Sequence, residues 1–158
     1  MSPRKYPLEA LARARGAKVD SAVQSLAGAV RVREGAERDR QVAEARKEEH
    51  ERVAREVKAA ERAALERGER SAADLARENA WAVRGAAERG ALAANVEKAR
   101  ASESAAQGAQ ADAQREVGAR RADVKVVDTH RQGWEEARRA AANAADEEAS
   151  AEAWRPKG

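Results

Sequence analysis

The sequence predicts an all-α protein, a long antiparallel two-helix coiled-coil hairpin whose second helix is longer than its first. Charged residues make up 37% of the chain, and the hydrophobic residues are mostly alanine, which favours helix but buries little area. No segment has the composition of a strand, and one short stretch combines a helix stop with a helix start. These observations predict a single hairpin over residues 1–158, with helices over about 7–67 and 72–153 and a turn over about 68–71.

The first predicted helix begins at a proline and carries a narrow apolar stripe. Pro7 suits the first helical turn, where a missing N–H costs nothing. The stripe then recurs at spacings of three, four and eight residues. It consists of Leu8, Leu11, Val19, Val23, Leu26 and Val30. From Arg31 to Arg52 it thins, and from Val53 it resumes about one residue out of phase. This slip predicts either a stutter in the coiled coil or a repeat of about 11 residues through Leu8, Val19 and Val30.

The predicted turn is defined by three residues. Gly68 can adopt the left-handed conformation that ends a helix. Ser71, followed three residues later by Asp74, has the pattern of a helix N-cap with a reciprocal acidic partner. One helix therefore ends here and the next begins.

The second predicted helix carries a heptad repeat without a break. One series of core positions is Leu75, Ala82, Arg89, Val96, Glu103, Gln110, Val117, Val124, Arg131 and Arg138. The other series is Glu78, Gly85, Leu92, Ala99, Ala106, Ala113, Arg120, Val127, Trp134 and Ala141. Because only about half of these positions are apolar, the sequence predicts a weak seam whose polar members fix the register.

An antiparallel fold about this turn places residue i opposite about residue 140 − i. This pairing sets Leu65 against Leu75 beside the turn and Tyr6 near Trp134 at the paired termini. Trp81 and Trp154 fall off the seam, which is typical of aromatic anchors for a partner. Beyond about Ala140 the second helix has no partner within the chain.

Composition and charge argue against several classes of protein. The 31 basic and 28 acidic side chains alternate along the chain, which favours a salt-bridged helix surface over a nucleic-acid interface. Without cysteine, neither disulfides nor a cysteine-based zinc site can form. With no apolar signal segment and no stretch long enough to span a bilayer, the expected location is the cytoplasm.

The sequence offers no chemistry for catalysis, metal binding or a cofactor. His50 and His130 are far apart and have no metal-ligand spacing, so we expect solvent-exposed positions for both. The carboxylates alternate with basic residues at helical spacing, which describes ion pairs better than an acid–base pair. A two-helix hairpin also lacks the concave pocket that an enzyme needs. We therefore expect a non-enzymatic protein.

Several segments resemble a known family. They are the opening stretch from Lys5 to Arg15, the single turn, the Trp81 segment with Leu92 and Val96, the stretch from Val126 to Glu136, and Asp146–Glu148. Together they resemble the FliJ/YscO family, the coiled-coil stalk proteins of flagellar and non-flagellar type III secretion systems.

The resemblance implies a cytoplasmic stalk at the inner-membrane export apparatus, similar to the central stalk of rotary ATPases. The paired termini would sit in the pore of the export ATPase hexamer, the body would reach toward the export gate, and substrate chaperones would be further partners. By position, the implied ATPase-facing residues are Tyr6, Leu8, Leu11, Arg13, Arg15, Arg138, Arg139, Glu147 and Glu148. The implied gate-facing residues are Trp81, Val83 and Leu92.

Two alternatives belong to other classes. A generic coiled-coil scaffold, with arms that pair between chains, would have the same composition. A hydrophilic stress-protective protein would be disordered in water and helical on drying, which the Ala/Glu/Arg content and the glycines favour. The capped turn, the three Trp residues and the unbroken heptad argue against this last class.

Overall fold

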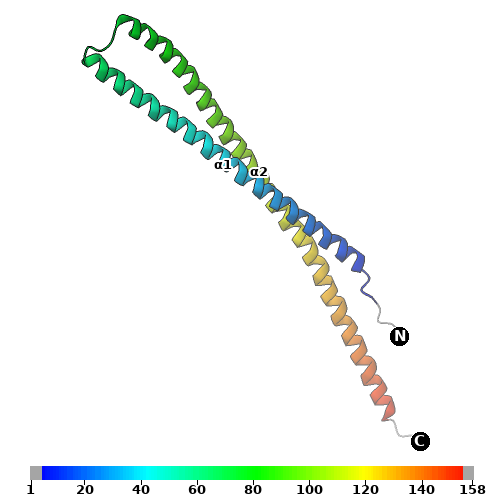
Figure 1. The fold of residues 1–158 in the computed structure, drawn as a ribbon. Helices are drawn as coiled ribbons and strands as arrows, with labels where there is room; N and C mark the ends of the chain where they lie inside the picture. Colours follow the sequence, from blue (N-terminus) through cyan, green and yellow to red (C-terminus); the bar gives the residue numbers. More distant parts are fainter. Residues whose placement is uncertain (1–4, 155–158) are drawn as a thin grey trace. The chain divides into compact units, whose positions relative to one another are not determined.

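The computed structural model describes residues 5–154 and contains two helices, α1 (Glu9–Glu66) and α2 (Ala72–Ala153). They pack against each other as a helical hairpin (Figure 1), and no strand occurs in the described part of the chain. Because α2 has 82 residues and α1 has 58, the prediction of an all-α hairpin with a longer second helix is confirmed.

Helix α1 ends in a Schellman motif at the predicted glycine. Gly68 has a φ of 68°, and its N–H donates to the Leu65 carbonyl at 3.0 Å. The Glu69 N–H reaches back to the Ala64 carbonyl at 3.1 Å. This pair of hydrogen bonds satisfies carbonyl groups that the helix end would leave without partners, and it requires the left-handed residue that glycine supplies.

Helix α2 begins in a capping box. The Asp74 N–H donates to Ser71 Oγ at 3.3 Å, and the Ser71 N–H donates to Asp74 Oδ2 at 2.9 Å. The Ser71 hydroxyl also donates to Asp74 Oδ2, at 2.7 Å. This side-chain bond first, and the bond from the Ser71 N–H second, lower the pKa of Asp74. Arg70 adds ion pairs with Glu61 at 3.5 Å and Glu78 at 3.4 Å, so it ties the end of α1 to the start of α2. The predicted turn chemistry is confirmed.

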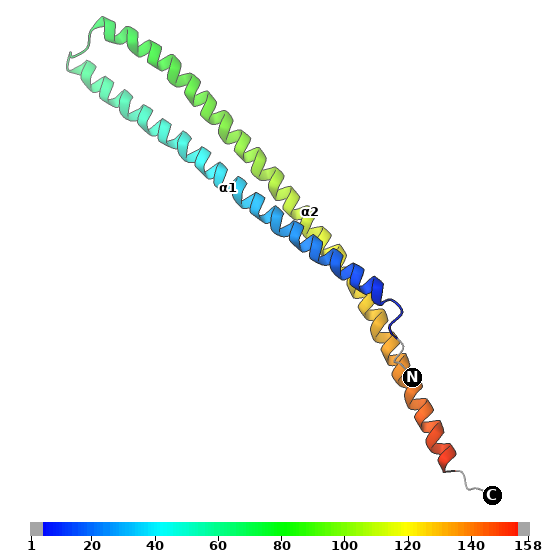
Figure 2. The ribbon, with the colours of Figure 1, turned by 45° about the vertical axis from the view of Figure 1, so that its right-hand side comes forward.

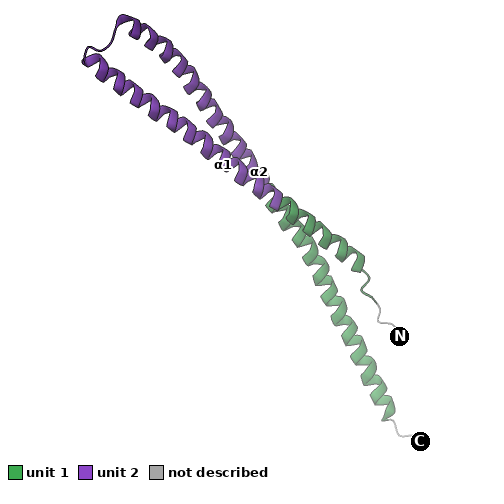
Figure 3. Cartoon of the chain, viewed as in Figure 1, with its two compact units in different colours: residues 1–26, 112–158 green, residues 27–111 purple. Residues whose placement is uncertain are grey.

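The chain divides into two compact units, coloured separately in Figure 3. Unit 1 contains residues 1–26 and 112–158, and unit 2 contains residues 27–111. Each unit therefore holds one segment of α1 and one segment of α2. The two units are described in turn.

In unit 1, the first turns of α1 lie along α2, as two views show (Figures 1 and 2). The buried residues are Tyr6, Ala22, Val117 and Val127, which are 3–8% exposed. Three of these four side chains are aliphatic and small, so the helices are held by a thin seam with Tyr6 as its only large buried side chain in the described residues.

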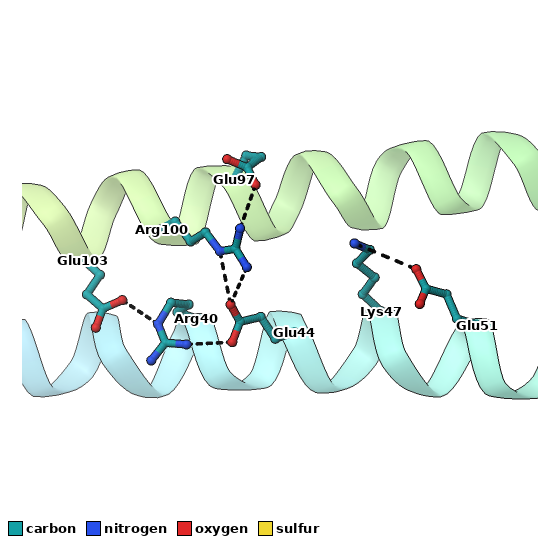
Figure 4. A network of polar contacts seen from close by, with 7 residues as sticks. All are labelled: Arg40, Glu44, Lys47, Glu51, Glu97, Arg100 and Glu103. Atoms are coloured by element: carbon teal, nitrogen blue, oxygen red, sulfur yellow. Dashed lines mark hydrogen bonds and ion pairs between the residues drawn. The ribbon is translucent and has the colours of Figure 1, made fainter.

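In unit 2, Ala36, Val96 and Ala106 are buried, and polar contacts cross the seam between them (Figure 4). Arg40 Nε donates to Glu103 Oε2 at 2.5 Å, and Arg100 donates to Glu44 at 3.0–3.1 Å. The hydrogen bond from Arg100 is the main reason that the pKa of Glu44 lies below its usual range.

Three further polar atoms of the unit 2 seam lack a hydrogen bond. They are Arg33 Nε, His50 Nδ1 and Gln110 Oε1, which are buried and have no partner among the described residues. An unsatisfied buried polar atom costs about 1–3 kcal/mol. This part of the seam therefore combines cross-helix ion pairs with a stability cost, as expected for a coiled coil with polar core positions.

The covered positions of α1 correct the predicted stutter. They keep a seven-residue spacing through the region where the valines change phase. One series is Leu8, Arg15, Ala22, Ala29, Ala36, Ala43 and His50, and the other is Ala12, Val19, Leu26, Arg33, Arg40, Lys47, Ala54 and Glu61. All are buried or half-buried, whereas Val32, Val42 and Val53 are exposed. The valines are therefore not part of the seam, and the seven-residue spacing of the covered positions continues without a change of phase.

Along α2, the predicted heptad positions are covered from Val96 to Arg131 in the first series and from Glu78 to Trp134 in the second. Leu75, Ala82 and Arg89 of the first series are exposed. Leu65, which was predicted to face Leu75, is also exposed, at 51%. The heptad prediction therefore holds over most of α2 and is wrong for the first series beside the turn.

Candidate functional site

In unit 1, Tyr6 is held against α2 by four groups. Its hydroxyl lies 2.8 Å from His130 Nδ1 and 3.3 Å from the Val127 carbonyl oxygen. The Trp134 ring meets it edge-on at 5.5 Å between centroids, and the Arg131 guanidinium lies 4.9 Å from the Tyr6 ring. The predicted packing of Tyr6 against Trp134 is confirmed. We call these residues the tyrosine clasp.

Two polar contacts extend the tyrosine clasp along α1. Glu9 forms an ion pair with Arg131, and Arg15 Nη1 donates to the Asp123 carbonyl at 2.7 Å. Both contacts join residues more than 100 positions apart in the sequence, and each pair sums to approximately 140. The register expected from the position of the turn is therefore the register of unit 1.

The clasp leaves part of the predicted ATPase-facing segment exposed. Leu8 and Arg15 are half-buried, whereas Leu11 is 40% exposed and Arg13 is exposed. Tyr6 itself is only 8% exposed. Within this segment, Leu11 and Arg13 are therefore accessible, whereas Tyr6 is not.

The last part of α2 is entirely exposed. Every described residue from Glu136 to Trp154 falls in the exposed class, and Trp154 is 90% exposed. Arg138 places its guanidinium 5.4 Å from the Trp134 ring, and Arg139 lies 3.8 Å from Glu135. Glu147 and Glu148 lie about one turn before the end of α2, and no basic residue occupies the last turn of this helix as the structure describes it.

In unit 2, the predicted gate-facing residues differ in exposure. Trp81 is 67% exposed and Val83 is 73% exposed, whereas Leu92 is half-buried in the seam. The Arg84 guanidinium lies 5.2 Å from the Trp81 ring. Leu92 therefore has a packing role, and Trp81 and Val83 are available to a partner.

A groove of about 330 Å³ opens between α1 and α2 beside Trp81. Both views show the two helices apart next to the turn (Figures 1 and 2). The groove is lined by His50, Val53, Ala54, Val57, Lys58, Glu61, Glu78, Trp81, Ala82, Arg84, Gly85, Glu88 and Arg89. Its apolar walls come from two valines of α1 and the indole of α2, none of which the seam covers.

Sequence reasoning missed the role of both histidines. His130 is exposed as a residue, as expected, but its Nδ1 is bonded to Tyr6. His50 is half-buried, and its Nε2 lies 3.1 Å from Glu88. The 140 − i pairing places Tyr6 only four residues from the position opposite His130. The predicted register could therefore have indicated the contact between Tyr6 and His130.

Within the described residues, no group of three or more His, Cys, Asp or Glu side chains could hold a metal ion. Neither α1 nor α2, as far as the structure describes them, has a stretch long and apolar enough to cross a membrane. No protein-family model, curated protein or solved structure matches the chain.

Proposed function

We propose that this chain is a non-enzymatic stalk of a type III secretion export apparatus, which inserts its paired termini into the export ATPase hexamer. The resemblance of its segments to the FliJ/YscO family suggests the class. The observation that carries the proposal is the tyrosine clasp. It joins two segments that resemble the family, the N-terminal segment and the stretch around Trp134, within one compact unit.

The surface of unit 1 supports this use. Leu11 and Arg13 are exposed on α1, and the exposed end of α2 carries Glu147 and Glu148. Arginine and acidic residues on rigid helices can pair with charges of a surrounding ring, and such pairs give specificity and steer association. A helical segment without an intramolecular partner has room for a ring of subunits around it.

On the gate side, the proposal assigns Trp81 and Val83 to contacts with the export gate or with substrate chaperones. An exposed Trp on a helix is a typical anchor for a partner, and Val83 would add apolar contact area. Leu92 is half-buried in the seam, so the proposal gives it a packing role and no contact with the partner.

The test is a titration of the full chain into the type III secretion ATPase of the same organism. Ring formation is followed by sedimentation, and ATP turnover is measured in parallel. We expect the chain to promote the hexamer at about one stalk per six subunits, because a central stalk is shared by the whole ring. Absence of binding at all concentrations would overturn the proposal.

Matched variants locate the binding surface. Leu11→Ala combined with Arg13→Glu should weaken ATPase binding by about tenfold or more. Arg31→Glu changes the same kind of exposed charge further along α1 and should bind normally. Glu147→Lys with Glu148→Lys tests the end of α2 in the same way. Equal binding by all of these variants would contradict the assigned surface.

A second candidate is a coiled-coil scaffold in which the arms pair between chains. The exposed Val32, Val42, Val53 and Val57 of α1 favour it, because they could join a seam with another chain. Sedimentation with circular dichroism separates the two functions. A dimer whose helicity falls on dilution would support the scaffold and contradict an intramolecular hairpin.

A further inference from the structure

The groove beside the turn is an apolar surface that the hairpin leaves uncovered. Val53, Val57 and Trp81 line it and are 43%, 49% and 67% exposed. The residues between them are too small to fill its volume of about 330 Å³. These small residues are Ala54, Ala82 and Gly85. A contiguous exposed apolar surface with a polar rim is typical of a site that binds a partner.

The groove has the length and the periodicity of a helix. Its lining runs from His50 to Glu61 on α1 and from Glu78 to Arg89 on α2. Each of these segments is about 17 Å long, which is about three helical turns. Along both segments the lining residues recur at spacings of three and four, as on a helix face that packs against another helix. A third helix lying in the groove would therefore contact one such face on each wall.

The acidic side chains that line the groove all have partners within the hairpin. Glu88 Oε2 lies 3.1 Å from His50 Nε2. Glu61 and Glu78 both form ion pairs with Arg70, at 3.5 Å and 3.4 Å. The carboxylates of the groove are therefore already engaged by groups of the same chain.

The basic side chains that line the groove have no acidic partner. They are Lys58 on α1 and Arg84 and Arg89 on α2, and all three are exposed. None of them forms an ion pair within the part of the chain that the structure describes. Arg84 lies 5.2 Å from the Trp81 ring, beside the apolar surface. The unpaired charges of the groove are therefore all positive, and they come from both helices.

We propose that the groove binds an acidic amphipathic helix of another protein, about three turns long. Large apolar side chains of this helix cover Val53, Val57 and Trp81. Carboxylates on its two flanks pair with Lys58 on one wall and with the two arginines on the other. Helix-in-groove recognition uses apolar anchors at these spacings. The inference concerns unit 2 alone and does not depend on the ATPase contact of the proposed function.

The unpaired charges select this partner over others. A basic helix would bring like charges to Lys58, Arg84 and Arg89, and such juxtaposition disfavours binding. A second copy of this chain would bring the same three cations to the contact. A small apolar ligand would fill the groove but would leave the cations without partners. An acidic helix satisfies both the apolar walls and the charged rim.

The first experiment measures the binding of two synthetic helical peptides of about 18 residues to the full chain by fluorescence anisotropy. Both peptides are alanine-based with leucine at spacings of three and four. One carries glutamate on both flanks, and the other carries lysine there. We expect the glutamate peptide to bind with a dissociation constant below about 100 µM, and the lysine peptide to bind about tenfold or more weakly. Added salt should weaken binding of the glutamate peptide, because it screens exposed charges.

Matched variants test the apolar anchor. Trp81→Ala should raise the dissociation constant of the glutamate peptide by about tenfold or more. Trp154→Ala is the control, because Trp154 is 90% exposed but belongs to unit 1. It should leave binding unchanged. Circular dichroism of each variant shows that the hairpin is still folded.

A charge reversal tests the rim. Arg84→Glu combined with Arg89→Glu should reverse the preference, so that the lysine peptide binds more tightly than the glutamate peptide. Arg31→Glu combined with Arg38→Glu changes the net charge by the same amount at exposed positions of α1 outside the groove. This control should keep the preference for the glutamate peptide.

Three results would overturn the proposal. They are no saturable binding of the glutamate peptide up to about 1 mM, equal binding of the two peptides, and binding that Trp81→Ala leaves unchanged. Sedimentation of the chain alone tests occupation by a second copy. A dimer that Trp81→Ala dissociates would also overturn the proposal, because the chain itself would then cover the groove. The ATPase titration measures binding by unit 1, so its outcome is independent of these results.

Discussion

Tyr6 in unit 1 and Trp81 in unit 2 are both large aromatic residues beside a helix pair, yet Tyr6 is 8% exposed and Trp81 is 67% exposed. Tyr6 packs on Trp134, which occupies a half-buried heptad position. Trp81 lies beside the turn, where the heptad positions Leu75 and Ala82 are themselves exposed. Burial here follows how closely the two helices pack, and not the size of the side chain.

The largest expected effect comes from removing the buried aromatic. Tyr6→Ala loses the ring packing on Trp134 and the hydroxyl contacts with His130 and Val127. Truncation of a well-buried aromatic side chain costs about 3–5 kcal/mol. We expect a loss of about 3 kcal/mol in the free energy of local opening of unit 1, measured by native-state hydrogen exchange.

Trp81→Ala is the matched control for that measurement, and it should change local opening by less than about 0.5 kcal/mol. Tyr6→Phe keeps the ring and should lose only about 1 kcal/mol, the contribution of the hydroxyl. If Tyr6→Ala and Trp81→Ala gave equal exchange rates, the contrast between the two aromatics would be wrong.

A smaller effect separates two neighbouring valines of α2. Val127 is 3% exposed in the seam, and Val126 is 65% exposed on the outside of the helix. Val127→Ala should destabilise the chain by about 1–2 kcal/mol, since it removes buried methyl groups. Val126→Ala should change stability by less than about 0.5 kcal/mol. Urea unfolding of both variants measures the difference, and equal midpoints would contradict the seam register.

Much of the fold was predictable because it depends on local chemistry and on phase. Gly68, Ser71 and Asp74 specify the turn through their own backbone and side-chain hydrogen bonds. The α2 heptad and the position of the turn then give the contact between Tyr6 and Trp134. Neither the turn nor this contact depends on the conformations of the long charged side chains.

The prediction of a stutter in α1 was wrong because it assumed that the valines mark the covered positions. In the structure, Arg33, Arg40 and Lys47 occupy the covered positions, where long side chains bury their methylene groups and extend their charges to water. From the sequence alone, such positions are assigned to the exposed surface because their residues are charged. The bond from Tyr6 to His130 and the groove beside Trp81 were missed for a related reason, since both depend on side-chain placement around a known register.

Replacement by alanine should change the stability of the chain in opposite directions at Gly108 and Gly68. Gly108 lies inside α2 with nothing within 4 Å of an added Cβ, so Gly108→Ala should stabilise the chain by about 0.5–1 kcal/mol. Gly68 has a φ of 68°, and Gly68→Ala should destabilise it by about 1 kcal/mol. Thermal unfolding followed by circular dichroism measures both signs. Stabilisation by Gly68→Ala would contradict the Schellman motif.

The smallest expected effect is the acid sensitivity of the turn. The pKa of Asp74 is lowered by its hydrogen bonds with Ser71, so the folded state favours the carboxylate. The resulting stabilisation is complete above the ordinary Asp pKa of about 3.9 and is lost as the pH falls through the lower, folded value. Stability should therefore decrease on acidification below about pH 4.

Ser71→Ala isolates this contribution, because it removes the side-chain hydrogen bond that lowers the pKa most. The variant should be less stable than the original chain at pH 7 by about 1 kcal/mol, the usual cost of a lost N-cap. The difference should narrow below about pH 4, where Asp74 becomes protonated in both chains. Arg100→Gln, which removes the bond to Glu44 in the unit 2 seam, should leave that Ser71-dependent difference unchanged. A difference that stayed constant down to about pH 2 would mean that the cap does not depend on the Asp74 carboxylate.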